Sequence, residues 1–372
     1  MPRTPRRPGD PPAKGRAQRK ARRPKVPKEA PLDAHWDDFY ARRGGRFYKD
    51  RHWLRRELPE LMPDEVNSDP LKHQDELTSD GEAVRRDDAF PAARELGDHE
   101  MVGLEAGCGC GAAAFPLLRA NPHLFLLCAD FSAEAIGILK ARAEYGAQLR
   151  SRARRCHAWV ADAGADPHDA TWEPCDALAA SLGGLHVITL IFALSALTRA
   201  RAAACVARCA RLLRPGGLLF VRDYAAGDLA QARLDAKPGR RTGEEGGYAR
   251  GEGTLARYFS LADFDALFAG DFDALDVGFV ERDITNRKQR VTMARRWIQG
   301  KYARKGAPPF CGVPAKRANV AEAAPAVRRP PAPPRGVSTV PAAAPPAPTM
   351  PPAGSTDTRR PRAGACLECS LS

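Results

Sequence analysis

Short apolar runs recur through the middle of the chain, separated by longer mixed stretches, and each has the length of a buried strand. The runs are Met101-Val-Gly-Leu104, Leu124-Phe-Leu-Leu-Cys-Ala129, Leu185-His-Val-Ile-Thr-Leu-Ile191 and Leu218-Leu-Phe-Val221, and a further strand is expected to end at Val160-Ala161-Asp162. Before the last run, Cys205, Cys209 and Leu212 share one face of an expected helix, which Arg214-Pro-Gly-Gly217 should stop. Strands that alternate with helices predict a doubly wound α/β fold with helices on both faces of the sheet.

A glycine-rich turn follows the first run. Gly107, Gly109 and Gly111 allow the backbone to turn sharply and to approach a ligand closely before a helix begins. Asp130 ends the next run, where an acid can accept hydrogen bonds from two ribose hydroxyls. Strand, turn, helix, strand and terminal acid together make one βαβ unit. The sequence therefore predicts a nucleotide-type cofactor at the carboxyl ends of the strands, in preference to an ordinary strand-to-helix turn.

The acid Glu105, just before this turn, bears on which cofactor fits. The pattern Glu-Ala-Gly-Cys-Gly-Cys-Gly departs from Gly-x-Gly-x-x-Gly, so the helix that follows is less suited to hold a pyrophosphate. A carboxylate here also opposes an anionic ligand but attracts a sulfonium or an amino group, and S-adenosylmethionine carries both. Asp162, at the end of the third strand, can accept from the adenine amino group. We therefore expect S-adenosylmethionine rather than NAD.

Several longer segments point beyond the cofactor. They are Trp36-Asp-Asp-Phe-Tyr40, Arg46-Phe-Tyr-Lys-Asp-Arg-His-Trp53, Leu104-Glu-Ala-Gly-Cys-Gly109, Phe115-Pro-Leu-Leu118, Asp130-Phe-Ser132, Ile191-Phe-Ala-Leu-Ser-Ala196, Leu213-Arg-Pro-Gly-Gly217, Arg222-Asp-Tyr224 and Met293-Ala-Arg-Arg-Trp-Ile-Gln-Gly-Lys-Tyr302. In this order they resemble the methyltransferase-like family of tRNA N(3)-methylcytidine methyltransferases. The glycine and Pro-Gly-Gly turns are common among methyltransferases, whereas Phe-Tyr-Lys-Asp-Arg-His-Trp and Ile-Phe-x-Leu-Ser-Ala are narrow.

This resemblance implies a seven-stranded, Rossmann-like class I methyltransferase sheet, S-adenosylmethionine as cofactor and tRNA as substrate. It implies a lid over the cofactor, contributed by the amino-terminal segment. Arg51, His52, Trp53 and Arg257 are the implied substrate-binding residues. The cofactor-binding set is Trp36, Tyr40, Gly107, Gly109, Asp130, Asp162, Ala163 and Ile191. Aromatic residues such as Trp36 have an alternative reading, which is helix packing onto the sheet.

Methyl transfer to cytosine N3 asks little acid–base chemistry of a protein. The ring nitrogen carries a neutral lone pair at pH 7, so alignment should dominate, and positioning alone can lower a barrier by ~7–11 kcal/mol. The product ring is cationic, and a nearby carboxylate would stabilise that charge as it develops. We expect Asp223 in this role, with Tyr224 stacking on or hydrogen-bonding the flipped base. The alternative for Asp223 is a structural ion pair with Arg222.

Two segments depart from the family pattern. Ala225 follows Asp-Tyr where relatives usually have glycine, and Arg250-Gly-Glu-Gly-Thr-Leu-Ala-Arg257 is longer than the family pattern Arg-Gly-Asp-Gly-Thr-Arg. The second departure moves an arginine, which leaves open whether Arg257 replaces the family residue. Residues 228–248 are rich in Gly, Arg and Glu, which predicts a mobile loop.

The chain divides by composition into four parts: a disordered basic tail (1–30), a lid and substrate-binding segment (31–100), the methyltransferase domain (101–303) and a disordered Pro/Ala-rich tail (304–372). The first 30 residues carry a net charge of +9 and residues 301–372 carry +8, which leaves about −4 of the total +13 for the core. RNA affinity must therefore come from local arginine patches or from the tails. A nonspecific solvated arm or a nuclear address explains the tails equally well.

The chain has 10 cysteines and no apolar run long enough for a membrane span or a secretory signal. Cys366 and Cys369 have metal-ligand spacing but no second pair nearby, so we expect no metal. Cys369-Ser-Leu-Ser372 formally fits a prenylation box, with Ser370 a poor aliphatic position. The prolines of the first 30 residues oppose a mitochondrial import helix, so the cytoplasm or the nucleus is favoured and organellar import is left open.

Two other classes of function remain open. A methyltransferase acting on a protein or a small molecule would share the cofactor half but would not need the Phe-Tyr-Lys-Asp-Arg-His-Trp segment. A catalytically inactive RNA-binding adaptor would keep the fold, although the intact Gly107, Asp130, Asp162 and Asp223 argue against it. The sequence does not say which tRNAs are modified, whether position 32 of the anticodon loop is the target as in the family, or whether a partner such as a tRNA synthetase is required.

Overall fold

The computed structural model describes residues 31–45, 47–61, 88–96, 101–150, 154–286 and 291–310. The predicted tail at 1–30, and residues 311–372 of the other tail with their Cys366 and Cys369, lie outside the described residues. Within the described ranges, no helix combines the length and the apolar character that a membrane crossing requires. Single helical turns occur at η1 (Pro59–Leu61), η3 (Ala93–Leu96), η4 (Ala170–Trp172) and η5 (Leu194–Ala196).

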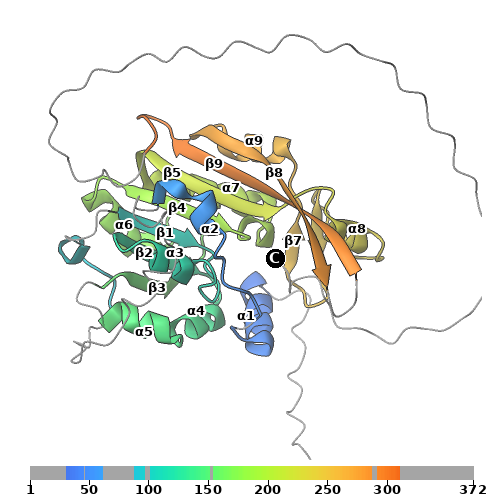
Figure 1. Ribbon diagram of the computed structural model, residues 1–372, viewed down its shortest axis with the longest axis horizontal. Coiled ribbons are helices and arrows are strands. Elements are labelled where there is room, and N and C mark those ends of the chain that lie inside the picture. Colours follow the sequence, from blue (N-terminus) through green and yellow to red (C-terminus); the bar gives the residue numbers. More distant parts are fainter. Residues whose placement is uncertain are drawn as a thin grey trace, which may run out of the picture.

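A seven-stranded sheet forms the centre of the molecule, in the order β3-β2-β1-β4-β5-β9-β8 (Figure 1). The first five of these strands are parallel, and β9 runs antiparallel to both β5 and β8. This confirms the expected doubly wound, class I methyltransferase sheet. The strands are β1 (Met101–Ala106), β2 (Leu124–Asp130), β3 (Cys156–Val160), β4 (Leu185–Ile191), β5 (Leu213–Tyr224), β8 (Phe272–Asn286) and β9 (Val291–Arg304).

Helices cover both faces of the sheet, as predicted. On one face, α6 (Glu173–Ser181), α7 (Arg199–Leu212) and α9 (Leu261–Phe268) bury side chains such as Cys175, Cys205 and Phe264 against the strands. On the other face, Leu54, Phe115 and Leu139 belong to a second core cluster. The helices of that face are α2 (Leu54–Glu57), α3 (Ala114–Ala120), α4 (Ala133–Lys140) and α5 (Ala143–Arg150).

The expected boundaries hold with small shifts. α7 ends at Leu212, as the Arg214-Pro-Gly-Gly217 turn predicts, but β5 already begins at Leu213 and includes that turn. Gly216 has φ +75°, which permits the irregular start of the strand. Likewise, β1 continues through Glu105 to Ala106, so Glu105 lies inside the strand.

The predicted mobile loop at 228–248 contains regular structure instead. The carboxylate of Asp228 accepts a hydrogen bond from the amide of Ala230 and begins α8 (Leu229–Asp235). Leu234 of this helix packs with Tyr248 of β6 (Gly247–Ala249), which pairs with β7 (Leu255–Arg257). The loop prediction is therefore wrong for these stretches, because an N-cap acid and two buried apolar side chains outweigh the Gly and Arg content.

Candidate active site

A pocket opens at the carboxyl ends of β1, β2 and β4, with about 920 Å³ of empty space, part of it open to solvent. Helix α1 (Leu32–Arg43) closes one side and packs against α4 (Figure 1). The eight residues predicted to bind the cofactor all line this pocket: Trp36, Tyr40, Gly107, Gly109, Asp130, Asp162, Ala163 and Ile191. The fold therefore brings together residues that are far apart in the sequence, and their individual roles stay predictions.

The glycine turn forms a cradle at the base of the pocket. Gly107 has φ +75° and Gly109 has φ +53°, backbone conformations that L side chains rarely adopt. The amide of Gly109 donates to Oδ2 of Asp130 (2.8 Å), and the amide of Ser132 donates to Oδ1 (2.9 Å). A carboxylate has about four acceptor positions, so Asp130 retains capacity for two ribose hydroxyls. Its burial raises the pKa of Asp130 to about 6.

Glu105 places an unpaired carboxylate oxygen beside this cradle. Its side chain is 2% exposed, and none of the described residues donates a hydrogen bond to Oε2. Burial raises the pKa of Glu105 to about 8, an effect that Arg51 opposes and Asp130 reinforces. A buried carboxylate oxygen without a donor is costly unless a ligand supplies positive charge or a donor. The pocket therefore fits S-adenosylmethionine, whose amino and sulfonium groups are cationic.

Helix α1, which belongs to the segment predicted to act as a lid, is held to the start of α4 by its Asp37 side chain. Asp37 Oδ1 accepts from the hydroxyl of Ser132 (2.6 Å) and from the amide of Glu134 (3.1 Å), at the start of α4. Trp36 and Tyr40 pack in an aromatic cluster with Phe39 while also facing the pocket. Trp36 and Tyr40 therefore both pack in a core cluster and line the pocket, so the two alternatives for these aromatic residues do not exclude each other.

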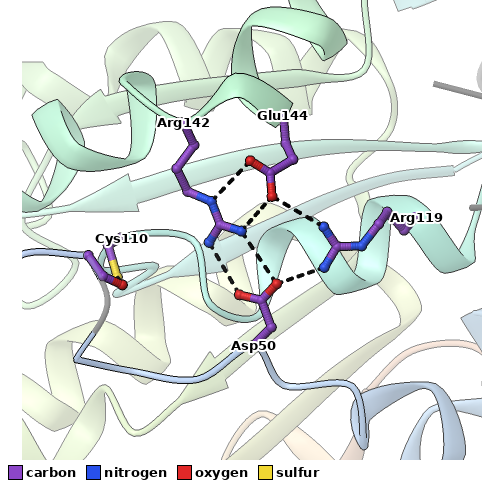
Figure 2. Close-up of polar contacts among 6 residues, drawn as sticks. Asp50, Cys110, Arg119, Arg142 and Glu144 are labelled. Carbon is purple, nitrogen blue, oxygen red and sulfur yellow. Dashed lines mark hydrogen bonds and ion pairs between the residues drawn. The ribbon is translucent and has the colours of Figure 1, made fainter. Parts of the chain in front are cut away.

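An ion-pair cluster anchors the segment that follows the lid. Figure 2 shows Asp50 facing the guanidinium groups of Arg119 and Arg142, which also contact Glu144. The amide of the next residue, Arg51, donates to the carbonyl of Ala112 (2.7 Å). The cluster therefore fixes the backbone immediately before Arg51.

Of the four residues predicted to bind the substrate, only Arg51 lines the pocket. Arg51 lines the pocket, with its guanidinium carbon 5.0 Å from the centroid of the Phe192 ring. His52 is exposed, and Trp53 stacks on the guanidinium of Arg222. Arg257 forms an ion pair with Glu244. The latter three do not line the pocket.

Asp223 and Tyr224 take different positions at the end of β5. Tyr224 lines the pocket. Asp223 is fully buried behind it and accepts hydrogen bonds from the amides of Ser195 (2.9 Å) and Tyr224 (2.8 Å). Arg222 lies between the rings of Trp53 and Trp297, so it does not form the alternative ion pair with Asp223. The geometry assigns Asp223 to holding the pocket wall rather than to touching a ligand.

Asp162 also has a partner, because Arg201 of α7 forms an ion pair with it. Its Oδ1 accepts from the amide of Gly164 (2.9 Å), which shapes the turn after β3. The side chain lines the pocket from this fixed position. Among the described residues, no three His, Cys, Asp or Glu side chains gather into a possible metal site.

Sequence reasoning missed several pocket residues, including Tyr48, Phe192, Ser195 and Arg250. Phe192 has φ +59°, which is unusual for a residue other than glycine and is typical of functional sites. Phe192 and Ser195 lie inside the narrow Ile-Phe-x-Leu-Ser-Ala motif, and Arg250 begins the stretch that departs from the family pattern. These motifs were the available signal, but they do not say which member faces a ligand.

Comparisons with known proteins identify the family to which this chain is similar. A family profile described as "Methyltransferase domain" matches residues 104–219. The tRNA N(3)-cytidine methyltransferase METTL2 of Danio rerio is 36% identical over 282 residues, covering 74% of this chain and 74% of the relative. METTL2 of Mus musculus is 34% identical over 310 residues (73% and 75%), and the tRNA N(3)-methylcytidine methyltransferase trm140 of Schizosaccharomyces pombe is 32% identical over 273 residues (73% and 74%). The chain therefore belongs to the family of tRNA N(3)-cytidine methyltransferases.

Proposed function

We propose that this protein transfers the methyl group of S-adenosylmethionine to N3 of a cytidine in tRNA. The observation that carries the proposal is the unpaired carboxylate oxygen of the buried Glu105 beside the glycine cradle and Asp130, next to the predicted lid of the amino-terminal segment. The named activity of the relatives supports the choice of tRNA and of N3. A protein or small-molecule methyltransferase would not account for the likeness along the lid segment.

S-Adenosylmethionine, when bound, supplies a methyl group on a sulfonium. Glu105 would hold its positive charge, and Asp130 would accept from the ribose hydroxyls while fixing the glycine turn. Cytosine N3 provides the electron pair of the new N–CH₃ bond, and the pair of the broken S–CH₃ bond stays on sulfur. Positive charge moves from sulfur to the ring, and no proton has to be transferred.

The chain's contribution is alignment of the base, which can lower the barrier by ~7–11 kcal/mol. The rings of Phe192 and Tyr224, with centroids 5.1 Å apart, provide apolar surface beside the cofactor cradle. Arg51 lies over Phe192 from the lid side. A flipped cytosine can stack against such a surface, as bases do in enzymes that modify them outside the helix.

Three finer points belong to this proposal. The target is position 32 of the anticodon loop, a partner such as a tRNA synthetase assists substrate selection, and the protein acts in the cytoplasm or the nucleus. Mass spectrometry of tRNA nucleosides from cells lacking the protein tests the activity, with loss of 3-methylcytidine expected and restored by the wild type. Normal 3-methylcytidine in those cells, together with methylation of protein extract by the purified enzyme, would favour the other substrate class.

Cofactor binding is expected to release a proton near pH 7. Glu105, with its pKa raised to about 8 by burial, is mostly protonated there, and a bound cation favours its ionised form. Affinity for S-adenosylmethionine should therefore rise with pH between roughly 6 and 8 and then level off. Calorimetry in buffers of different ionisation enthalpy measures the released proton, and Glu105→Gln should remove it. Equal heats in all buffers for the wild type would contradict this role of Glu105.

A further inference from the structure

The pocket lining includes a second arginine besides Arg51. Arg250 is 6% exposed and lines the pocket, and its guanidinium carbon lies 5.3 Å from the centroid of the Tyr224 ring. Arg51 lies over Phe192 in the same way. Each arginine therefore lies over one ring of the aromatic pair beside which the target base is proposed to lie.

The β6–β7 hairpin carries two buried arginines, and they differ in what they face. Arg257 is 5% exposed, pairs with Glu244 and does not line the pocket. Arg250 lies at the other end of the connecting turn, lines the pocket and lies over the ring of Tyr224, and its positive charge lowers the pKa of Asp223 against the larger effect of burial. Although the sequence favours Arg257 for contact with substrate, the hairpin points Arg250 into the site.

A close backbone contact fixes the turn that carries Arg250. The amide of Arg250 donates to the carbonyl of Thr254 (2.8 Å), and the amide of Gly253 donates to the carbonyl of Arg250 (3.0 Å). Gly253 has φ +94°, and a Cβ there would lie 2.2 Å from Nδ1 of His35, a buried residue of the lid helix. The turn therefore packs directly on the lid, with no room for a side chain between them.

The chemistry of the two partners limits how Arg250 can meet a cytosine. A guanidinium has donors and no acceptor, so it must face an acceptor atom. The Watson–Crick edge of cytosine offers O2 and N3 as acceptors, and its amino group is a donor. N3 uses its lone pair for the incoming methyl group, which leaves O2. Asp223 provides a compensating negative charge near Arg250 when the ring becomes cationic.

We propose that Arg250 donates a hydrogen bond to O2 of the target cytosine and thereby turns N3 toward the methyl group. This inference rests on the proposed function and adds a substrate-contacting residue and the base atom that it recognises. Gly253 and His35 act as positioning residues, because they hold the turn of Arg250 against the lid.

The experiment compares cytidine with 2-thiocytidine at the methylated position of a tRNA, because sulfur is a much weaker acceptor than oxygen. Wild type and Arg250→Met are each assayed on both substrates, with affinity for S-adenosylmethionine and melting temperature measured alongside. Arg250→Met should lower kcat/KM on the cytidine substrate by roughly 10²-fold. The sulfur substitution should slow the wild type but cause little further loss in Arg250→Met, whereas Arg257→Met should retain the sensitivity to sulfur.

The contact with O2 would be overturned if 2-thiocytidine lowered kcat/KM by the same factor in Arg250→Met as in the wild type. Full activity of Arg250→Met on the cytidine substrate would also overturn it. Absence of 3-methylcytidine with the wild type would overturn the proposed function itself, which keeps the two failures distinct. A glycine pair tests the positioning without touching Arg250. Gly253→Ala, like Arg250→Met, should lower kcat/KM, and it should reduce the difference in rate between the cytidine and 2-thiocytidine substrates. Gly251→Ala should behave as the wild type, because its Cβ would meet nothing nearer than Arg240 at 3.8 Å.

Discussion

Replacing Gly107 by alanine is expected to abolish binding of S-adenosylmethionine while the sheet stays folded. Gly107 has φ +75°, and a Cβ there would lie 2.5 Å from the Cβ of Ala193, closer than real Cβ atoms come. Relief of this contact must displace the turn after β1 or the loop after β4, and both line the pocket. We expect the dissociation constant to rise at least roughly 10²-fold, about 2.7 kcal/mol of binding free energy. Isothermal titration calorimetry measures it.

Gly137→Ala provides the matched control. Gly137 lies on the exposed side of α4, with no atom within 4 Å of its would-be Cβ and no positive φ. Alanine there should leave cofactor affinity unchanged and stabilise the fold by ~0.5–1 kcal/mol, because it reduces the freedom of the unfolded chain. Wild-type affinity in Gly107→Ala would show that the glycine turn does not hold the cofactor.

The parallel half of the sheet could be predicted from the sequence because its strands are buried on both faces. Such strands appear as continuous apolar runs, and β1 and β2 are buried at every position. The antiparallel strands β8 and β9 are not marked by continuous apolar runs of this kind. β8 exposes Asp273, Leu275 and Asp276, and its pairing with β9 fixes it more than any apolar run does. A strand held mainly by its neighbour cannot be recognised from its own residues.

The candidate site also contains some residues whose positions the sequence predicts and others whose positions it does not. Gly107 and Asp130 follow strands, so the topology alone brings them together. Arg257 and Arg250 lie on one small hairpin, and which of them faces the pocket depends on the pairing of Gly247 with Arg257 and on the packing of Gly253 against His35. The contact between Gly253 and His35 joins segments about 200 positions apart, which a local pattern does not encode.

Asp223→Ala is expected to lower kcat by roughly 10²-fold or more, with a smaller effect on affinity for the cofactor. The substitution removes the acceptor of the Ser195 and Tyr224 amides. Each unpaired buried donor costs ~1–3 kcal/mol, so the wall that presents Tyr224 should loosen. Single-turnover kinetics separates the loss in methyl transfer from binding, and a thermal scan should show a lower melting temperature. Unchanged kcat in a folded Asp223→Ala protein would remove Asp223 from the mechanism.

The pH dependence separates this positioning role from a purely structural one. Burial raises the pKa of Asp223 to about 6, while its hydrogen bonds to Ser195 and Tyr224 and the charge of Arg250 oppose the shift. Between roughly pH 4 and 6 the folded protein holds a proton that the unfolded chain releases, so this group adds stability as the pH falls through 6. The ionised form is the better acceptor for both amides and the better counter-charge for the cationic ring, so kcat should fall over the same interval. Asp223→Asn should lose both inflections, because its amide does not titrate, and it should keep more stability than Asp223→Ala because one acceptor oxygen remains. A kcat that stays constant or rises as the pH falls through 6 would show that methyl transfer does not need the ionised form of Asp223.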